Sequence, residues 1–379
     1  MGTITRRDML GAAGGLMVGA AAVNAAQPEK GEEALPRFRI SLVKQNGRVL
    51  KGGWAKEATV RQLPISRGIA GVLMGLKPGG LRELHWHANA AEWGYVLKGK
   101  VRTTVLAPDG TSETNDFGPG DVWYFPRGHG HSIQGLVPEE CQFILVFDNG
   151  EFSEFGTFSS TDWVGHLPPE VLAKSLGLPR SAAAKFPRKE LYIVQGRVPP
   201  EKIPANHRPG LHTPPETHRY PLLAQKPTVT YPGGEERVVS ANEFPISKTI
   251  TGVILDLKPD ALREPHWHPH ANEWQYYISG QARMTLFGSG GRARTEEFSP
   301  GDVGYVPQGY GHYIENNGSE PCRILVAFDS GDYQEIGLST WLAANPTRLV
   351  ADNFQMPEAV TEKLPKRRVF IASSEGPKK

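Results

Sequence analysis

Two stretches of the sequence carry the same set of metal-binding side chains. The first contains His85, His87 and Glu92, and the chain supplies His131 further on. Histidines two residues apart on a strand point to the same face. Imidazole and carboxylate ligands together suit a six-coordinate transition metal such as Mn or Fe, with positions left open for substrate or dioxygen. Structural zinc fits less well, because it usually takes four ligands with thiolates among them.

The same residue types recur 181 positions further along the chain. The repeated candidates are His266, His268, Glu273 and His312. The register holds without a gap from Pro64, which matches Pro245, to Asp148, which matches Asp329. A lone buried histidine is more often a hydrogen-bonded core residue than a ligand, but a complete set repeated in one register favours metal binding. The sequence therefore predicts a duplicated domain with one metal site in each copy.

The repeated unit has the pattern of a β-protein. Short apolar or alternating runs are separated by Gly, Pro and Asp-Gly turn signals, which predict many short strands. Strands at this spacing favour a sandwich or barrel over a parallel sheet. Helical patterns occur only after the β-rich part of each copy, at residues 168–178 and 339–354. The proline-dense stretch 187–230 predicts an extended surface connector outside the core strands.

The first 26 residues differ in composition from the rest of the chain. Arg6 and Arg7 precede a short Gly- and Ala-rich run and a small-residue cleavage site, which predicts an export signal rather than a membrane span. The stretch TRRDML resembles a twin-arginine signal, which implies export of a folded protein to the periplasm or the medium. We therefore predict three parts, with the signal at 1–26, an N-terminal domain at 27–190 and a C-terminal domain at 191–379.

The ligand spacing resembles the two motifs of the cupin superfamily. The pattern G-x5-H-x-H-x4-E-x6-G runs from Gly79 to Gly99, and G-x5-P-x-G-x2-H runs from Gly120 to His131. The copies depart from the motifs only at non-ligand positions, at Asp260 in the second and Gly135 in the first. The resemblance implies an all-β fold of two tandem cupin barrels, each a jelly roll (double-stranded β-helix), with short flanking helices.

Longer stretches around the ligands resemble the bicupin oxalate decarboxylase family. They include RELHWH, EWGYVLKG, DVWYFPRGHGHSIQG, REPHWHPHANEWQYYISGQARMT and GDVGYVPQGYGHYIEN. The resemblance implies Mn bound by three histidines and one glutamate in each barrel, two ions per chain, with Fe as the less favoured metal. It also implies dioxygen-dependent conversion of oxalate to formate and CO2 in a homo-trimer or homo-hexamer. A net charge of +2 argues against a nucleic-acid partner, and beyond the signal no segment reaches membrane-span length.

The same resemblance implies that two arginines bind substrate. Arg82 precedes His85 by three positions, and a regular strand would turn it away from the metal. The family has an arginine here that reaches the substrate, which requires a local twist or bulge. Its guanidinium can hold a carboxylate oxygen, and Arg263 repeats it in the second copy. The competing interpretation is a salt bridge at the rim with Glu83 or Glu264.

The resemblance further implies a glutamate on a mobile lid as the proton carrier. The matching residue is Glu154, in a Ser-Glu-Phe-Gly stretch where the family commonly has Ser-Glu-Asn-Ser. Lid closure favours formate over peroxide because it excludes water. The offset makes Glu335 a second candidate, whereas Val326 stands where better-known relatives have an acidic residue. We expect the first site to be the main catalytic one and the second to be partly competent through Glu335.

Two alternative functions share parts of this pattern. An oxalate oxidase would give CO2 and hydrogen peroxide, so the ratio of formate to peroxide distinguishes it. A storage or binding bicupin, such as a seed globulin, needs neither complete ligand sets nor Arg82 and Glu154, and it would be recognised by an absence of bound metal and turnover. Other cupin dioxygenases and isomerases share the ligands, but their sequences match less well around them.

Overall fold

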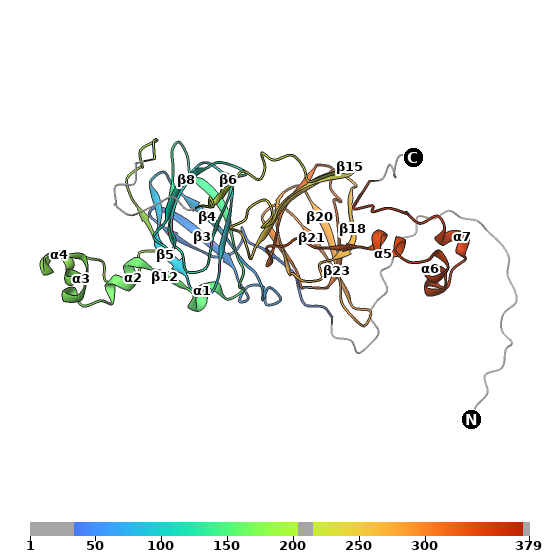
Figure 1. Cartoon of the computed structure of the whole chain (residues 1–379), viewed down its shortest axis with the longest axis horizontal. Helices are drawn as coiled ribbons and strands as arrows, with labels where there is room; N and C mark the ends of the chain where they lie inside the picture. The colour runs from blue at the N-terminus through green and yellow to red at the C-terminus, as the bar shows by residue number, and fades with distance from the viewer. Residues whose placement is uncertain (1–33, 204–214, 374–379) are drawn as a thin grey trace, which may run out of the picture.

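The structure is a computed structural model that describes residues 34–203 and 215–373, apart from the side chains of residues 154 and 155. Two β-barrels lie side by side along the long axis, and a group of helices projects from each outer end (Figure 1). Each barrel consists of one seven-stranded and one six-stranded sheet. This arrangement confirms the predicted class of two tandem cupin barrels with short flanking helices. The predicted export signal lies outside the described residues.

The first barrel is built mainly from the first copy of the repeat. Its seven-stranded sheet consists, in spatial order, of β14 (Arg219–Tyr220), β9 (Val122–Phe125), β6 (Glu92–Lys98), β11 (Cys141–Phe147), β4 (Ala70–Leu76), β3 (Gly53–Ala58) and β2 (Gly47–Leu50). Its six-stranded sheet consists of β12 (Thr157–Ser159), β5 (Gly80–His87), β10 (Gly130–Gly135), β7 (Val101–Leu106) and β8 (Ser112–Phe117), with β13 (Ile193–Gln195) paired to β5.

The second barrel repeats this plan. Its seven-stranded sheet consists of β1 (Arg39–Ser41), β22 (Asp302–Val306), β19 (Glu273–Ser279), β24 (Cys322–Phe328), β17 (Thr251–Leu257), β16 (Gly234–Val239) and β15 (Val229–Tyr231). Its six-stranded sheet consists of β21 (Ala293–Phe298), β20 (Ala282–Phe287), β23 (Gly311–Glu315), β18 (Leu262–Trp267) and β25 (Ile336–Gly337), with β26 (Ile371–Ala372) paired to β18.

Short helices follow the last long strand of each barrel. After the first barrel come α1 (Phe152–Phe155), α2 (Ser160–Gly165), α3 (Pro169–Leu176) and α4 (Arg180–Ala183), and after the second come α5 (Leu338–Ala343), α6 (Thr347–Phe354) and α7 (Glu358–Thr361). Proline stands at the first position of α3, and Gly177 ends this helix in the left-handed conformation. Within the described residues, every helix is too short or too polar to cross a bilayer.

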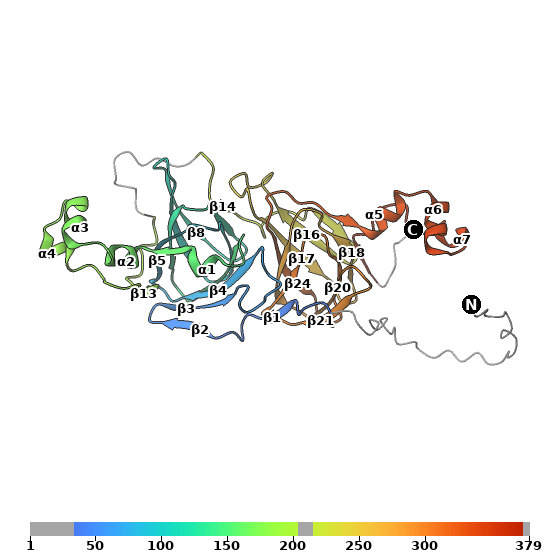
Figure 2. The ribbon, with the colours of Figure 1, turned by 90° about the horizontal axis from the view of Figure 1, so that it is seen from below.

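The two barrels exchange edge strands. β1 precedes the first barrel in the chain but pairs with β22 of the second, with Ile40 opposite Val303. β14 precedes the second copy but pairs with β9 of the first, with Tyr220 opposite Val122. Figure 2 shows β1 against the second barrel, beside β21. Each barrel is therefore completed across the boundary that the repeat places near residue 190. The described part of the proline-dense connector contributes only the short edge strands β13, β14 and β15.

A shared apolar core joins the barrels. The indole of Trp93 lies against Gly252, and the indole of Trp274 lies against Gly71, so a Cβ atom at either glycine would overlap a ring. Both tryptophans are fully buried in one cluster with residues of both barrels. Each tryptophan directly follows a glutamate of the repeated ligand set, and neighbouring strand residues face opposite sides of a sheet. The Glu-Trp pair therefore places one side chain inside its own barrel and the next against the other barrel.

Candidate metal centres

The structure brings the first set of candidate ligands together inside the first barrel. His85 and His87 come from β5, Glu92 begins β6 and His131 lies on β10. One ligand atom from each lies within 4.8 Å of the others, and all four side chains are buried. The Glu92 carboxylate Oε2 is 3.2 Å from Nε2 of His87 and 3.3 Å from Nε2 of His131. We call this set the first centre.

The second set forms a matching centre in the second barrel, which we call the second centre. His266, His268, Glu273 and His312 are buried and their ligand atoms also lie within 4.8 Å of one another. Oε2 of Glu273 is 3.0 Å from Nε2 of both His268 and His312. These three atoms have no hydrogen-bond partner among the described residues. Buried lone pairs that converge in this way fit a bound cation.

Backbone carbonyl groups fix the orientation of the imidazoles. A carbonyl oxygen lies within hydrogen-bonding distance of Nδ1 in five of the six rings, at 2.7 Å for His85, 2.9 Å for His131, 2.7 Å for His266, 2.8 Å for His268 and 3.2 Å for His312. A carbonyl can only accept, so Nδ1 carries the proton and the lone pair of Nε2 faces the centre. Ligand histidines are commonly held by such partners.

The protonation states at the first centre also suit a metal. Burial lowers the pKa of His85 well below its ordinary value, and it lowers the pKa of His87 to about 4. Burial works to raise the pKa of the Glu92 carboxyl, but His131 and His87 outweigh it and hold this pKa well below its ordinary value. Near neutral pH the imidazoles of His85 and His87 are therefore neutral and the carboxylate of Glu92 is ionised, which are the forms that bind metal.

A bulge turns Arg82 towards the first centre. In the pairing of β5 with β10, His85 lies opposite His131, whereas Arg82 lies opposite Ile133. Three steps along β5 therefore match two steps along β10, and the extra residue changes the side that Arg82 faces. Arg82 is 3 % exposed, while Leu84, between Arg82 and His85, is 62 % exposed. The bulge that the resemblance requires is present.

Arg82 lines a cavity of about 330 Å³ next to the first centre. Its guanidinium donates a hydrogen bond of 3.2 Å to the carbonyl of Tyr192 and lies 4.1 Å from the centre of that ring. The neighbouring Glu83 faces elsewhere, because its carboxylate accepts backbone N–H groups of Tyr192 at 2.6 Å and Thr161 at 3.0 Å. The alternative of an Arg82–Glu83 salt bridge is therefore not what the structure shows.

Comparison with known proteins places this geometry in a family. The chain matches the cupin family over residues 42–183 and 220–362. It is 43% identical over 343 residues to Oxalate decarboxylase OxdC of Bacillus subtilis (strain 168), which covers 90% of this chain and 88% of that protein. The chain belongs to the bicupin oxalate decarboxylase family. A probable oxalate decarboxylase of Arthroderma benhamiae is 36% identical and covers 92% of this chain and 86% of its own length.

Solved structures agree with this family assignment. The structure of oxalate decarboxylase from Bacillus subtilis at pH 4.6 superimposes with a TM-score of 0.84 and 41% identity, covering 91% of this chain and 90% of that one. Another solved structure of the same enzyme concerns its Mn(II) centres. The solved structures therefore share the two-barrel fold of this chain, in which each barrel carries a His3Glu set.

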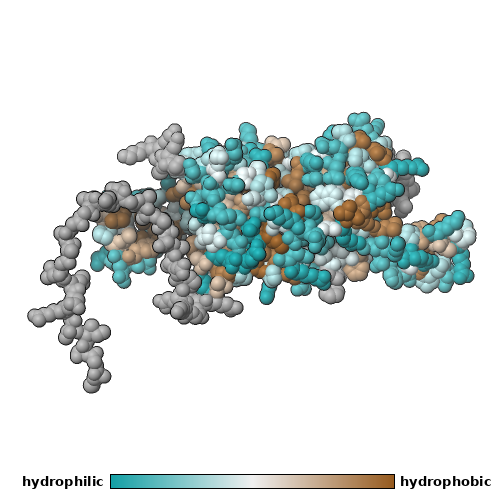
Figure 3. All heavy atoms as spheres, turned by 180° about the vertical axis from the view of Figure 1, so that it is seen from behind, coloured by the Kyte–Doolittle hydropathy of each residue, from teal (hydrophilic) through white to brown (hydrophobic). Residues whose placement is uncertain are grey.

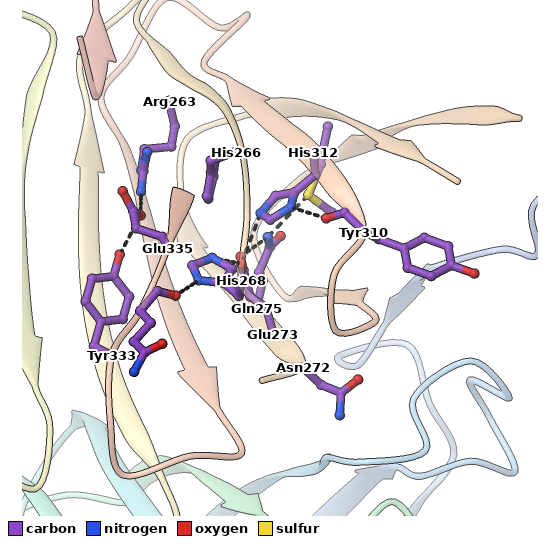
Figure 4. Close-up of polar contacts among 12 residues, drawn as sticks. Arg263, His266, His268, Asn272, Glu273, Gln275, Tyr310, His312, Tyr333 and Glu335 are labelled. Carbon is purple, nitrogen blue, oxygen red and sulfur yellow. Dashed lines mark hydrogen bonds and ion pairs between the residues drawn. The ribbon is translucent and has the colours of Figure 1, made fainter. Parts of the chain in front are cut away.

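Within this family fold, the second centre has different neighbours from the first. Arg263 is turned inward by the same kind of bulge as Arg82, but its guanidinium forms an ion pair with Glu335. The Tyr333 hydroxyl lies 3.0 Å from the same carboxylate (Figure 4). Arg368 forms a second ion pair with it. Glu264, like Glu83, accepts backbone N–H groups instead. Glu335, the candidate lid carboxylate of the second barrel, is therefore a buried ion-pair partner of Arg263 and Arg368.

The segment predicted to be the lid of the first barrel forms α1, which borders the cavity. Phe152 and Ser153 line the cavity, and the Phe152 ring stacks on Phe147 with centroids 3.7 Å apart. The side chain of Glu154, the predicted proton carrier, lies outside the described part of the structure. Its neighbours in α1 nonetheless bring this segment to the space beside Arg82.

Further polar residues line the first cavity without having been singled out in the sequence. They include Arg48, Glu57, Glu190 and Tyr192. Arg48 pairs with Glu190 at 3.1 Å and lies 3.8 Å from the centre of the Tyr192 ring. These residues precede or follow the cupin motifs, so ligand spacing does not reveal them. The only signal in the sequence is a charged residue in an otherwise half-buried strand, as Glu57 in β3.

Proposed function

We propose that this chain is a metal-dependent oxalate decarboxylase that converts oxalate to formate and CO2 at the first centre. One observation carries the proposal. A buried guanidinium, that of Arg82, lies beside the His3Glu centre in a cavity large enough for a small dianion. Such a site can hold one carboxylate of oxalate by its charge while the other faces the centre.

We propose Mn as the metal, one ion at each centre. The Mn(II) centres of the Bacillus relative and the donor set here support this choice, although Fe accepts the same ligands. When bound, the metal supplies Lewis-acid and one-electron chemistry, for which dioxygen is the proposed co-reactant. His85, His87, Glu92 and His131 would hold it at the first centre.

Arg82 and Glu154 have separate tasks in the proposed reaction. Arg82 binds and orients a carboxylate of oxalate through its fixed guanidinium. The C–C bond then breaks, CO2 leaves, and the remaining carbon takes up one proton to become formate. Glu154 accepts the proton of bound oxalate and returns it to that carbon. Closure of α1 over the cavity excludes water during this transfer.

The test is one assay on Mn-loaded protein that follows oxalate, formate, CO2 and hydrogen peroxide together. We expect one formate and one CO2 per oxalate consumed. Two CO2 and one peroxide per oxalate would instead identify an oxidase. The Ser-Glu-Phe-Gly stretch makes this alternative worth testing. One similar solved structure concerns a reaction specificity switch in oxalate decarboxylase. Protein that binds no metal and leaves oxalate unchanged would identify a storage or binding role.

We also propose that the chain assembles as a homo-trimer or homo-hexamer. Large apolar side chains are exposed on the helices that follow each barrel, α2 and α3 after the first and α5 and α6 after the second. They are Trp163, Val171, Leu176, Trp341, Leu349 and Phe354. Figure 3 shows apolar patches that interrupt the hydrophilic surface of the face in view. Burial of such side chains against another copy would favour association. Light scattering should give three or six times the mass of one chain, and a monomer would contradict the proposal.

For localisation we propose twin-arginine export to the periplasm or the medium. The support is the sequence of residues 1–26, with Arg6 and Arg7 ahead of a weakly apolar run. The test fuses these residues to a reporter that is exported only when folded. We expect export of the fusion, and its loss when both arginines are replaced by lysine. Export that is unaffected by this change would contradict the twin-arginine route.

A further inference from the structure

The two centres differ in the space beside them. The cavity next to the first centre measures about 330 Å³, whereas the one next to the second measures about 10 Å³. A water molecule needs roughly 10–15 Å³ of such space. The second centre therefore has room for about one water molecule and none for oxalate.

The side chain of Glu335 fills the place beside the second centre. Its carboxylate forms ion pairs with Arg263 and Arg368, and the Tyr333 hydroxyl lies 3.0 Å from one of its oxygens. Arg263 is 2 % exposed and Glu335 is 5 % exposed at the side chain. A second carboxylate, that of Glu236, lies 4.0 Å from Nε of Arg263. Figure 4 shows Glu335 between Arg263 and Tyr333.

No such internal partner is found at the first centre among the side chains that the structure describes, which leave out that of Glu154. Among the side chains that the structure describes, no carboxylate lies at ion-pair distance from Arg82. The position of Glu236 is taken by Ala55 in the first copy, at the same place in strand β3 as in β16. The duplicated barrels have therefore diverged in charge around an arginine that both retain.

A charge reversal strengthens this divergence. Tyr192 and Phe370 occupy equivalent places. The ring of Tyr192 lies against Arg82 and the ring of Phe370 against Arg263. The backbone N–H of each donates to the glutamate that follows the arginine, Glu83 in β5 or Glu264 in β18. Two residues earlier, the first copy has Glu190 and the second has Arg368. Arg368 adds a second cation next to the Glu335 carboxylate, which stabilises that carboxylate in the buried position.

We propose that Glu335 is a built-in carboxylate ligand of Arg263, which takes the place of a substrate carboxylate and closes the second centre to oxalate. The inference rests on the proposed function, because it takes oxalate as the ligand of the first centre. A carboxylate supplied by the same chain competes at high effective concentration against free oxalate. Glu335 is not one of the four metal ligands. The second centre therefore holds metal without turning over oxalate.

The experiment isolates the second centre. Glu92→Gln removes a ligand of the first centre, so that the Mn retained by the chain is at the second. Oxalate is then added, and its binding is followed by the change in the Mn(II) EPR spectrum. With Glu335 in place we expect no saturable change at oxalate concentrations that saturate the unaltered first centre. Adding Glu335→Ala should create saturable binding of oxalate. We expect its apparent affinity to exceed any affinity of the Glu92→Gln protein by about tenfold to 100-fold.

Two further variants separate this effect from general loosening of the barrel. Glu320→Ala removes an exposed carboxylate from the same barrel and should leave the second centre silent to oxalate. Arg368→Gln removes a half-exposed cation that holds Glu335, and it should give a smaller gain in oxalate binding. This second variant keeps the test decisive if the protein with Glu335→Ala does not fold or loses its metal.

The inference is overturned if the second centre binds oxalate while Glu335 is present. It is also overturned if neither Glu335→Ala nor Arg368→Gln increases binding in folded, metal-loaded protein. Failure of the proposed function would give a different result, because the unaltered chain would then make no formate from oxalate.

Discussion

At the scale of single residues, backbone groups take up the hydrogen bonds of the side chains around each centre. Imidazole N–H groups donate to backbone carbonyls, and the carboxylates of Glu83 and Glu264 accept from backbone N–H groups. Arg82 is consequently buried without the neighbouring glutamate as a partner. A buried cation in that position strongly favours an anionic ligand, because the ligand then supplies the missing charge.

The first prediction concerns the two ligand glutamates. Glu92→Gln should reduce bound metal from two ions per chain to one and lower kcat/KM for oxalate by at least about 100-fold, because the first centre loses its only carboxylate. The matched change Glu273→Gln should remove the other ion and leave most of the formate production. Metal analysis and formate assays on both proteins provide the check. Equal loss of activity in the two variants would contradict the assignment of turnover to the first centre.

The second prediction concerns pH and the metal-free protein. Burial lowers the pKa of His87 from 6.5 to about 4, so between these values the unfolded chain binds a proton that the folded chain does not. Stability should therefore fall as the pH drops through this window, by about 3 kcal/mol from His87 alone. The lowered pKa of Glu92 adds a loss at still lower pH. Urea unfolding of metal-free protein at pH 7 and pH 4.5 measures this, and equal stability would contradict it.

The ligand residues were predictable from the sequence, whereas their charged neighbours were not. A metal site needs the same residue types in both copies, so the fixed offset marks all eight ligand positions. Glu335 also lies on that offset, yet its carboxylate is held by Arg368 as well as by Arg263, and the counterpart of Arg368, Glu190, has the opposite charge. Tyr192 reaches the first cavity from a later segment of the chain, and no local pattern shows this.

At the scale of secondary-structure elements, α1 is the proposed lid, and it packs closely on the loop after β5. Gly156 ends α1 so close to Asn89 that a Cβ atom would overlap the amide side chain. The amide nitrogen of Asn89 lies 3.4 Å from the carbonyl of Glu151, at the start of the same helix. The position of the lid therefore depends on a glycine and an asparagine that stand outside the metal centre.

The third prediction follows from this contact. Gly156→Ala should displace α1 and lower the yield of formate relative to peroxide, because a lid that closes poorly admits water. The free energy of unfolding should change by only about 1 kcal/mol, since the displaced amide is the end of a side chain. Adding Asn89→Ala should restore the space and the product ratio. A double variant that behaves like the single one would contradict this explanation.

Most strands could be predicted from alternation and turn residues. The bulge in β5 was implied only by the family resemblance, because the spacing of Arg82 alone turns it away from the metal. The edge strands could not. β14 has two residues and β1 has three, which is too short for an alternating pattern. Their pairing partners lie in the other copy, so the choice is made by tertiary contacts that a local pattern does not contain.

At the scale of the whole molecule, the barrels form one unit through reciprocal packing of tryptophan on glycine. The fourth prediction tests this contact. Gly252→Ala should destabilise the protein by about 1–3 kcal/mol or more, because the new Cβ overlaps the buried Trp93 ring. Gly118→Ala is the matched control, since a Cβ there meets open space. Chemical unfolding of both proteins measures the difference, and equal stabilities would show that the ring can move aside.

Gly252→Ala should also affect metal binding at the first centre. Trp93 follows Glu92 on β6, so displacement of the ring shifts the backbone that carries the ligand. We expect Gly252→Ala, in the second barrel, to weaken metal binding in the first more than Gly118→Ala does, although Gly118 lies in the first barrel itself. Metal analysis after dialysis against a weak chelator measures this.

The exchange of edge strands has a consequence for the order in which the protein can be made. Residues 39–41 leave the ribosome among the first of the folded part, yet their partner strand ends at residue 306. β1 therefore stays unpaired during most of translation, because its partner β22 is made only when residues 302–306 have been added. A ribosome-bound chain that stops before β22 should accordingly leave this segment open to protease, and completion of β22 should protect it.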